Sequence, residues 1–211
     1  NLEGKSPLFP KKSTSVVLSK DYVTTLGYSG DDVATYVGLM EPATLAAAVE
    51  FDSDDLSEYV GNYITELSIA INNSELITSA KVFIIENGGT NDANIVVEQN
   101  VNFSDDWNSI TITNPYEITG EQIFVGYEVV VTGGRPLCTD AGPGNPKSRW
   151  VRVGGETEAW EDMIGVSIDK NFCIRAIVDT EGAFDEPIAG VFPLSFDAGN
   201  IVLSQTKTSQ E

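Results

Sequence analysis

The chain contains no histidine in its 211 residues. This absence removes the usual neutral-pH general base, the Ser-His-Asp and Cys-His nucleophile systems, and metal sites built on imidazole. Paired carboxylates could still support glycoside hydrolysis. An enzyme built on this sequence would therefore have to work with Asp and Glu.

Positive charge is scarce as well. Only 12 Lys and Arg stand against 32 Asp and Glu, which leaves a net charge of -20 at pH 7. Such a field repels phosphate backbones and anionic lipid, so we expect no nucleic-acid partner and no contact with a membrane surface. The same acidity keeps an exported protein soluble.

Long apolar runs are missing too. No stretch reaches the roughly 18 apolar residues of a membrane-spanning helix, so we expect no direct membrane insertion. The opening, NLEGKSPLFPKKSTS, lacks the apolar centre of a signal peptide. We expect an exported protein, at the cell surface or secreted, whose leader has already been removed.

The chain does contain many short runs that alternate as β-strands do. One face of YITELSIAI carries Thr65, Leu67, Ile69 and Ile71, and one face of IFVGYEVVV carries Ile123, Val125, Tyr127, Val129 and Val131. Further runs are KVFIIE, NIVVEQ, SITIT, DMIGVSI and FCIRAIV, separated by Gly, Asn, Asp or Pro clusters. This spacing predicts an all-β fold, a jelly-roll-like antiparallel β-sandwich.

One short helix is expected in FDSDDLSEYVG, near Ser53 to Tyr59. Ser53 stands at the N-cap position, two Asp follow in the first turn, and Gly61 can end the helix. The alanine-rich run VATYVGLMEPATLAAAVEF is interrupted by Pro42, so we expect two strands there with a turn between them.

The order of these pieces over residues 34–178 resembles the cleaved-adhesin domains attached to gingipain-type surface proteases. The matching pieces are DDLSEYVG, ITELSIAI, KVFIIENGG, the Trp107-Asn108 pair, FVGYE at 124–128, CTDAGP at 138–143 and NFCIRAIV at 171–178. The resemblance implies a jelly-roll β-sandwich on an exported bacterial protein. It implies a non-enzymatic adhesin-like module that binds a host protein, a host glycan or another bacterial surface protein.

The stretch CTDAGPGNPKSRW is the expected contact loop, because loops on a rigid sandwich carry binding groups. It collects cations and aromatic rings on an otherwise acidic chain, which suits a sugar ring or an anionic side chain. The candidate ligand-binding residues are Arg135, Asp140, Asn145, Lys147, Arg149, Trp150 and Trp160. The alternative is that the cations pair with neighbouring acids and that Trp150 caps the core.

The two cysteines, Cys138 and Cys173, are candidates for a disulfide. Cys173 and Arg175 lie on the face of FCIRAIV opposite to its apolar set. A bridge would close a loop of about 36 residues and stabilise the fold by about 3.8 kcal/mol in the chain-entropy model. Two unpaired buried thiols are the alternative.

No metal site is predicted. Oxygen ligands would favour calcium, the one cofactor that the sequence leaves open, but none of the three acidic clusters has the spacing of a calcium loop. They are Asp31-Asp32, Asp52-Ser53-Asp54-Asp55 and Asp105-Asp106. The calcium sites of the resembling family are therefore not carried over.

The expected organisation is an N-terminal linker over residues 1–13, a sandwich over 14–180 and a C-terminal segment, 181–211, packed on the sandwich. That segment has no counterpart in the resembling family. Two further function classes stay open beside the adhesin-like module. One is a glycan-binding accessory module of a polysaccharide-uptake system, which would need a pair of sugar-stacking aromatic rings. The other is a secreted hydrolase with two facing carboxyls.

Overall fold

The computed structural model describes residues 23–87 and 94–179, together with the backbone of β13 (Phe196–Asp197) and β14 (Asn200–Ile201), which pair with each other. The predicted linker, residues 1–13, lies outside the described residues. So does most of 181–211, and the packing of that segment stays a prediction. None of the helices in the described part is long and apolar enough to cross a membrane.

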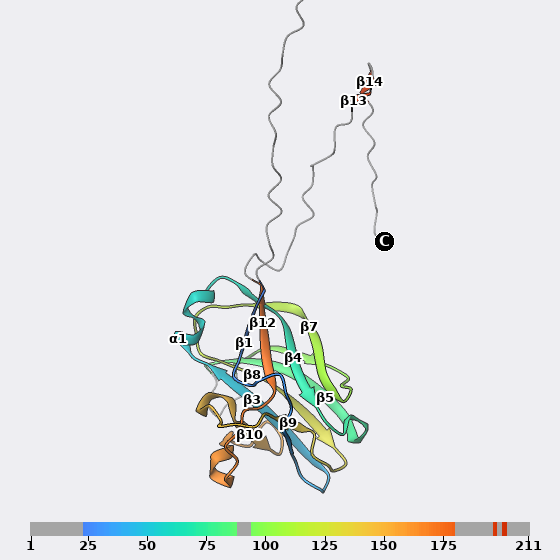
Figure 1. Cartoon of the computed structure of the whole chain (residues 1–211), viewed down its shortest axis with the longest axis vertical. Coiled ribbons are helices and arrows are strands. Elements are labelled where there is room, and N and C mark those ends of the chain that lie inside the picture. The colour runs from blue at the N-terminus through green and yellow to red at the C-terminus, as the bar shows by residue number, and fades with distance from the viewer. Residues whose placement is uncertain (1–22, 88–93, 180–195, 198–199, 202–211) are drawn as a thin grey trace, which may run out of the picture.

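Two six-stranded antiparallel sheets form the body of the molecule (Figure 1). The first sheet has the order β1 (Val23–Gly27), β12 (Ile174–Asp179), β4 (Tyr63–Ile71), β9 (Leu137–Thr139) and β2 (Thr35–Val37), and β7 (Asp106–Glu117) also pairs with β4. The second sheet has the order β11 (Glu161–Asp162), β10 (Trp150–Val153), β3 (Ala43–Phe51), β8 (Ile123–Val131), β5 (Ile77–Glu86) and β6 (Ile95–Asn100).

The strand pairing is that of a jelly roll. Taking the eight long strands β1, β3, β4, β5, β6, β7, β8 and β12 in chain order, the first pairs with the last, β3 with β8, β4 with β7 and β5 with β6. A chain folded back on itself in this way and wrapped into two sheets gives two Greek keys. The predicted all-β, jelly-roll-like antiparallel sandwich is therefore confirmed.

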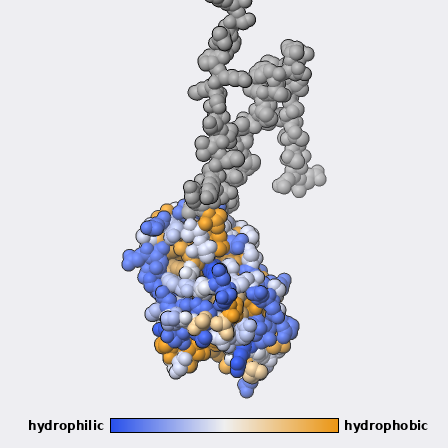
Figure 2. Space-filling model, in the orientation of Figure 1, coloured by the Kyte–Doolittle hydropathy of each residue, from blue (hydrophilic) through white to orange (hydrophobic). Residues whose placement is uncertain are grey.

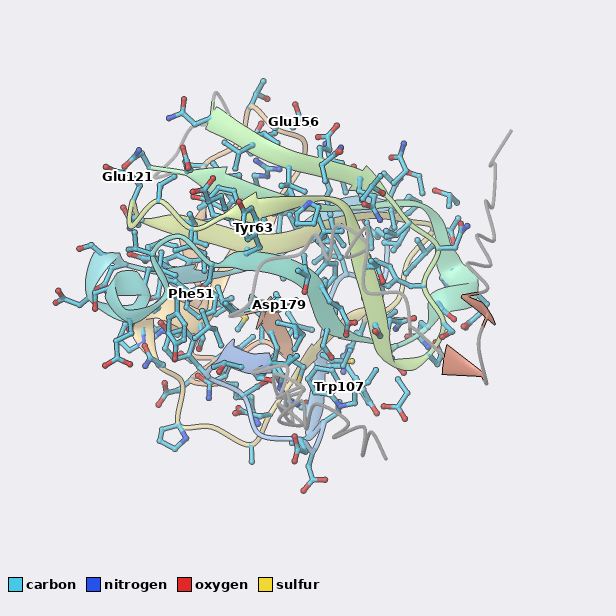
Figure 3. All side chains as sticks on the ribbon, turned by 90° about the horizontal axis from the view of Figure 1, so that it is seen from above. Phe51, Tyr63, Trp107, Glu121, Glu156 and Asp179 are labelled. Carbon is cyan, nitrogen blue, oxygen red and sulfur yellow. The ribbon has the colours of Figure 1, made fainter. Side chains whose placement is uncertain are left out.

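The main core lies between the two sheets. The alternating set of β8 named above is buried there in full, and β3 contributes Leu45, Ala47, Val49 and Phe51. Viewed from above, Trp107 and Glu156 lie on opposite outer sides of the two layers (Figure 3). The pleat of an extended chain has a period of two residues, and this period places the alternating side chains of β3 and β8 in the core.

Strand β4 departs from its predicted alternation at Thr65. The register with β12 passes from Ile64 directly to Glu66, which leaves Thr65 as the extra residue of a β-bulge. One extra residue exchanges the two faces of the strand on one side of the bulge, so Ile64 is buried in the core and Thr65 is half-buried. The prediction that Thr65 shares the core face with Leu67 is wrong for this reason.

The one α-helix of the described residues, α1 (Ser53–Leu56), lies where it was predicted and continues as a 3₁₀ turn over Ser57–Tyr59. Its N-cap is Asp52, one residue before the predicted Ser53. The Asp52 side chain accepts hydrogen bonds from the N–H groups of Asp54 and Asp55, and the Asp55 side chain accepts one from the Asp52 N–H. This reciprocal pair is a capping box, which fixes the start of the helix.

The run DMIGVSI is not the strand that its apolar residues predicted. Only Asp162 belongs to a strand, and Met163–Val166 form a 3₁₀ turn. The Asp162 side chain accepts a hydrogen bond from the Ile164 N–H at 2.9 Å, which gives the backbone a partner other than a neighbouring strand. Two further 3₁₀ turns lie at Ser74–Leu76 and Pro146–Ser148.

Candidate functional site

The loop between β9 and β10, the predicted contact loop, is held by its own polar side chains. Asp140 Oδ1 accepts hydrogen bonds from the N–H groups of Gly142 at 2.8 Å and Asn171 at 3.0 Å. Asn145 Oδ1 accepts one from the Lys147 N–H at 2.9 Å and caps the short 3₁₀ turn there. Asp140 and Asn145, two predicted ligand-binding residues, thus have main-chain partners that keep the loop in place.

Lys147 joins the loop to the start of α1. Its Nζ lies 2.5 Å from Asp52 Oδ2 and 2.8 Å from Asp55 Oδ2. The hydrogen bond from Lys147 holds the pKa of Asp52 below its usual range, and the two carboxylates hold the pKa of Lys147 above its own. Lys147 therefore acts as a cross-link between the loop and the helix.

Arg149 also forms ion pairs with two acids. Its Nε lies 2.6 Å from Asp162 Oδ1, and its Nη1 lies 2.8 Å from Asp169 Oδ1. The hydrogen bond to Asp162 is the main reason why the pKa of Arg149 is raised.

Arg135 lies apart from the group formed by Lys147, Arg149 and their acids. It is exposed beside Asn73, whose side-chain oxygen accepts the Arg135 N–H at 3.3 Å.

Trp150 and Trp160 pack on the outer face of the second sheet. The Phe124 ring contacts both, with centroid distances of 5.8 Å to Trp150 and 6.4 Å to Trp160. Trp160 is only 7% exposed, and half-buried Trp150 donates its indole N–H to Glu50 Oε2 at 3.1 Å. The two rings belong to a second, smaller apolar cluster with Ala46, Ala48, Phe83 and Ile85.

Arg152, the remaining cation of this region, is buried with that cluster. Its Nη2 lies 2.9 Å from Glu128 Oε2, and its guanidinium carbon lies 4.8 Å from the centroid of the Trp160 ring. Lys147, Arg149 and Arg152 are thus all in ion pairs. The region has mixed charge and does not offer the free basic and aromatic patch that its composition suggested.

A cleft opens between the two sheets at one edge of the sandwich. We call it the inter-sheet cleft, and its volume is about 380 Å³. Its walls come from β2 and β9 of the first sheet, from β3 and β10 of the second, and from residues 163–168 after β11: Val37, Leu137, Leu45, Val151, Met163 and Ile168. These side chains belong to the main core or pack against it, so the cleft opens directly onto the core.

The rim of the inter-sheet cleft is apolar and exposed. Leu39 is 43% exposed, Val153 is 52% exposed and Val166 is 64% exposed. Met40 and Ile164, beside them in the chain, are exposed too. Figure 2 shows apolar residues at the lower left of the molecule, at the end opposite to the point where the described chain begins and β12 ends.

The two ionisable residues that line the cleft are the acids of β11, Glu161 and Asp162. Neighbouring residues of a strand point to opposite faces, so these carboxyls do not face each other as a glycosidase pair would. Asp162 is also held by Arg149. Within the described ranges no group of three or more Cys, Asp or Glu is placed to hold a metal ion.

Cys138 and Cys173 are both free thiols in the structure, which has the alternative of two unpaired buried thiols and not the candidate disulfide. They are buried side by side in a small cluster with Ala70, and Trp107 packs on this cluster. Burial raises the pKa of each thiol to about 12. The thiols are therefore protonated at neutral pH and are poor nucleophiles.

Sequence reasoning missed the inter-sheet cleft. Apart from Leu45 of β3, its walls come from strands of two to four residues and from residues 163–168, which are too short for an alternation to be read. One signal was available. Leu39 and Met40 end the expected strand ATYVGLM, directly before the turn at Pro42, and two large apolar side chains next to a turn indicated an exposed apolar surface.

Neither a protein-family profile nor a curated protein matches this chain. Among solved structures, the chain is similar to a clostridial cysteine protease, Cwp84, after propeptide cleavage, with 14% identity and a TM-score of 0.53 over 75% of this chain and 40% of that one. It is also similar to the cysteine protease and lectin-like domains of Cwp84, a surface layer associated protein of Clostridium difficile. That match has 16% identity and a TM-score of 0.46 over 66% of this chain and 32% of that one. The chain thus spans less than half of either structure, and the first similarity concerns the fold.

Proposed function

We propose that this chain is a non-enzymatic, adhesin-like module of an exported bacterial protein, and that it binds a protein partner through the inter-sheet cleft. One observation carries the proposal: the cleft combines a cavity of about 380 Å³ with an exposed apolar rim. Exposed apolar patches around a preformed cavity are features of binding surfaces.

The resemblance to cleaved-adhesin domains supports this function and an exported location. A jelly-roll sandwich is the fold that the resemblance implies, and eight strands of the described chain have that pairing. Membership of that family remains part of the proposal, since it depends on the sequence motifs alone.

Catalysis by a cysteine nucleophile is disfavoured by this chain's own residues. It has no histidine to act as the base, and burial raises the pKa of both thiols to about 12. A carboxylate hydrolase is disfavoured at the cleft because Asp162 is tied to Arg149. These two facts support a binding role in place of a chemical one.

A glycan-binding accessory module is the second candidate. It would use stacked aromatic rings, and Trp150 is the half-buried ring at the edge of the outer aromatic cluster. Trp160 is buried against Phe83 and Phe124, which leaves no exposed pair of tryptophans there. We therefore place the glycan module second.

The test is a comparison of the full chain on two arrays at physiological salt, one of extracellular matrix and bacterial surface proteins and one of glycans. We expect saturable binding to at least one protein and none to glycans. Val166→Asn, on the rim of the cleft, should reduce the binding, and Val96→Asn, at an exposed position of β6, should not. Binding to glycans that Trp150→Ala removes would establish the second candidate, and binding to neither array would refute the adhesin-like function.

A further inference from the structure

The rim of the inter-sheet cleft exposes more apolar surface than its own neighbours can cover. Leu39, Val153 and Val166 are each more than two-fifths exposed, and they surround a cavity whose walls are also apolar. Isolated exposed aliphatic side chains are ordinary, but a contiguous set around a cavity indicates a surface that another molecule covers.

The negative charge of the cleft lining limits which molecules can bind there. Both ionisable residues of the cleft lining are acids, and Glu161 is exposed. The whole chain carries a net charge of -20. An occupant with a cation beside its apolar group would gain attraction from the rim, whereas an occupant with a carboxylate would be repelled.

The volume of the cleft limits the size of the group that it can hold. Sites for small ligands usually measure about 300–1,000 Å³, and the cleft lies near the lower end of that range. It is sized for one or two side chains. Its walls offer few polar groups to satisfy the hydroxyls of a glycan chain, since Glu161 and Asp162 are its ionisable residues.

We propose that the inter-sheet cleft receives an aliphatic side chain of a protein partner, presented on a segment that carries Lys or Arg directly beside it. This inference rests on the proposed protein-binding function and specifies its partner. The apolar side chain would fill the space between Val151 and Met163 at the edge of the core, and the flanking cation would lie against Glu161 on the rim.

Two other occupants fit the structure less well. A second copy of this chain would bring a surface of the same negative sign against the acidic rim. Strand β12, which precedes the chain's own tail, ends at the opposite end of the sandwich from β10, and β10 lines the cleft (Figure 1). The tail also begins with three acids, Glu181, Asp185 and Glu186, which the rim would repel.

The proposal is tested with fluorescein-labelled pentapeptides and the full chain, by fluorescence polarisation. The probe is Lys-Lys-Leu-Lys-Lys, and its controls replace the central Leu by Ser or every Lys by Glu. We expect saturable binding of the probe, with affinity at least about tenfold lower for the Ser control, as burial of one leucine side chain gives. The Glu control should not bind.

Variants of the chain test whether the peptide binds in the inter-sheet cleft. Val166→Asn removes an apolar contact without adding charge and should reduce affinity for the probe roughly tenfold. Val96→Asn, at an exposed valine on β6, should leave the affinity unchanged. Glu161→Gln should reduce affinity at low salt and have little effect at high salt, because salt screens exposed charges. Glu121→Gln, an exposed acid in the turn before β8, is its control. Circular dichroism and melting temperature establish that each variant is folded.

Several outcomes would overturn the proposal. Equal affinity for the Leu and Ser peptides, or binding that Val166→Asn does not change, would mean that the cleft is not the site. A dimer in sedimentation velocity that Val166→Asn dissociates would assign the cleft to a second copy. Phe192 belongs to the apolar run GVFPLSF of the chain's own tail, and stronger probe binding after Phe192→Ser would assign the cleft to that tail. If a protein on the array binds but the pentapeptides do not, the inference fails and the proposed function stands, whereas failure on both arrays removes the function itself.

Discussion

The main-chain N–H of Cys173 donates a hydrogen bond of 3.0 Å to the carbonyl oxygen of Cys138. One position further along, Thr139 and Phe172 are antiparallel partners. The two cysteines therefore stand opposite each other with their side chains on the same face, as directly opposed residues do. Opposed Cα atoms lie about 4.5–5.5 Å apart, which is within the span that a disulfide bridges.

These thiols should be unreactive while the protein is folded. Thiolate is the reactive form, and burial raises the pKa of both groups to about 12. With Ellman's reagent at pH 8 we expect slow release of colour from the native chain and rapid reaction of both thiols in urea. The Cys173→Ala variant should release half as much in urea. Equal rates with and without urea would contradict the buried arrangement.

The raised pKa of the two thiols also predicts that the protein loses stability at alkaline pH. The folded pKa, about 12, is above the ordinary value of 9.0, so the unfolded chain loses its thiol protons first as pH rises. The free energy of unfolding should be constant with respect to these groups below about pH 9 and fall between about pH 9 and pH 12. Urea titrations of the wild type and of a Cys138→Ala Cys173→Ala variant measure it. The variant should show a shallower decline, and parallel declines would exclude the thiols as the cause.

Asp52 combines two roles that can be separated by substitution. It caps α1, and it pairs with Lys147 from the contact loop. Asp52→Ala should lower the free energy of unfolding by about 1–2 kcal/mol, because it removes the cap. Asp52→Asn keeps a capping oxygen and should lower it by less than about 1 kcal/mol, the range for an exposed ion pair. Urea unfolding at pH 7 measures both changes.

The sign of the pH effect follows from the lowered pKa of Asp52. Its stabilising contribution is present above the ordinary value of 3.8 and is lost as pH falls through the folded pKa. The wild type should therefore lose more stability than Asp52→Asn when the pH is lowered below about 4. An identical acid profile for the two proteins would mean that Lys147 does not interact with Asp52 in solution.

Gly126 is expected to tolerate no side chain. A Cβ there would meet the Ala47 carbonyl oxygen of β3 and approach the Phe83 ring carbon Cζ to 2.8 Å. Neither the β3 backbone nor the packed ring can move freely, so Gly126→Ala should lower the free energy of unfolding by about 1–3 kcal/mol. Gly155→Ala, which meets nothing within 4 Å, is the matched control. Equal stabilities would show that both the β3 backbone at Ala47 and the Phe83 ring move aside.

Arg149 should affect stability and binding in opposite directions. Arg149→Ala removes its bonds to Asp162 and Asp169 and should lower the free energy of unfolding by about 1.5–3 kcal/mol. The same change leaves the Asp162 charge at the cleft without its partner, so affinity for the Lys-flanked peptide should rise. Urea unfolding and fluorescence polarisation measure the two effects, with Arg149→Lys as the control. A fall in affinity would mean that Arg149 contacts the ligand itself, as the sequence first suggested.

The sequence by itself determined the fold class and the main core face of β8. In IFVGYEVVV the strand period assigns Val125, Tyr127 and Val129 to one face whatever the rest of the chain does, because the period is a property of extended backbone. The lack of histidine likewise excluded imidazole chemistry without any structure. Such local properties need no knowledge of partners that are distant in the chain.

Tertiary structure decided the rest. The bulge at Thr65 is defined against the neighbouring strand, and the role of Arg149 is decided by Asp162 and Asp169, thirteen and twenty residues further along. The inter-sheet cleft combines walls from β2 and β10, more than a hundred residues apart. The number of cations alone predicted a basic patch. Whether each cation is paired or free depends on whether the fold places an acid within ion-pair distance. Non-local contacts of this kind leave no periodic signal in the sequence.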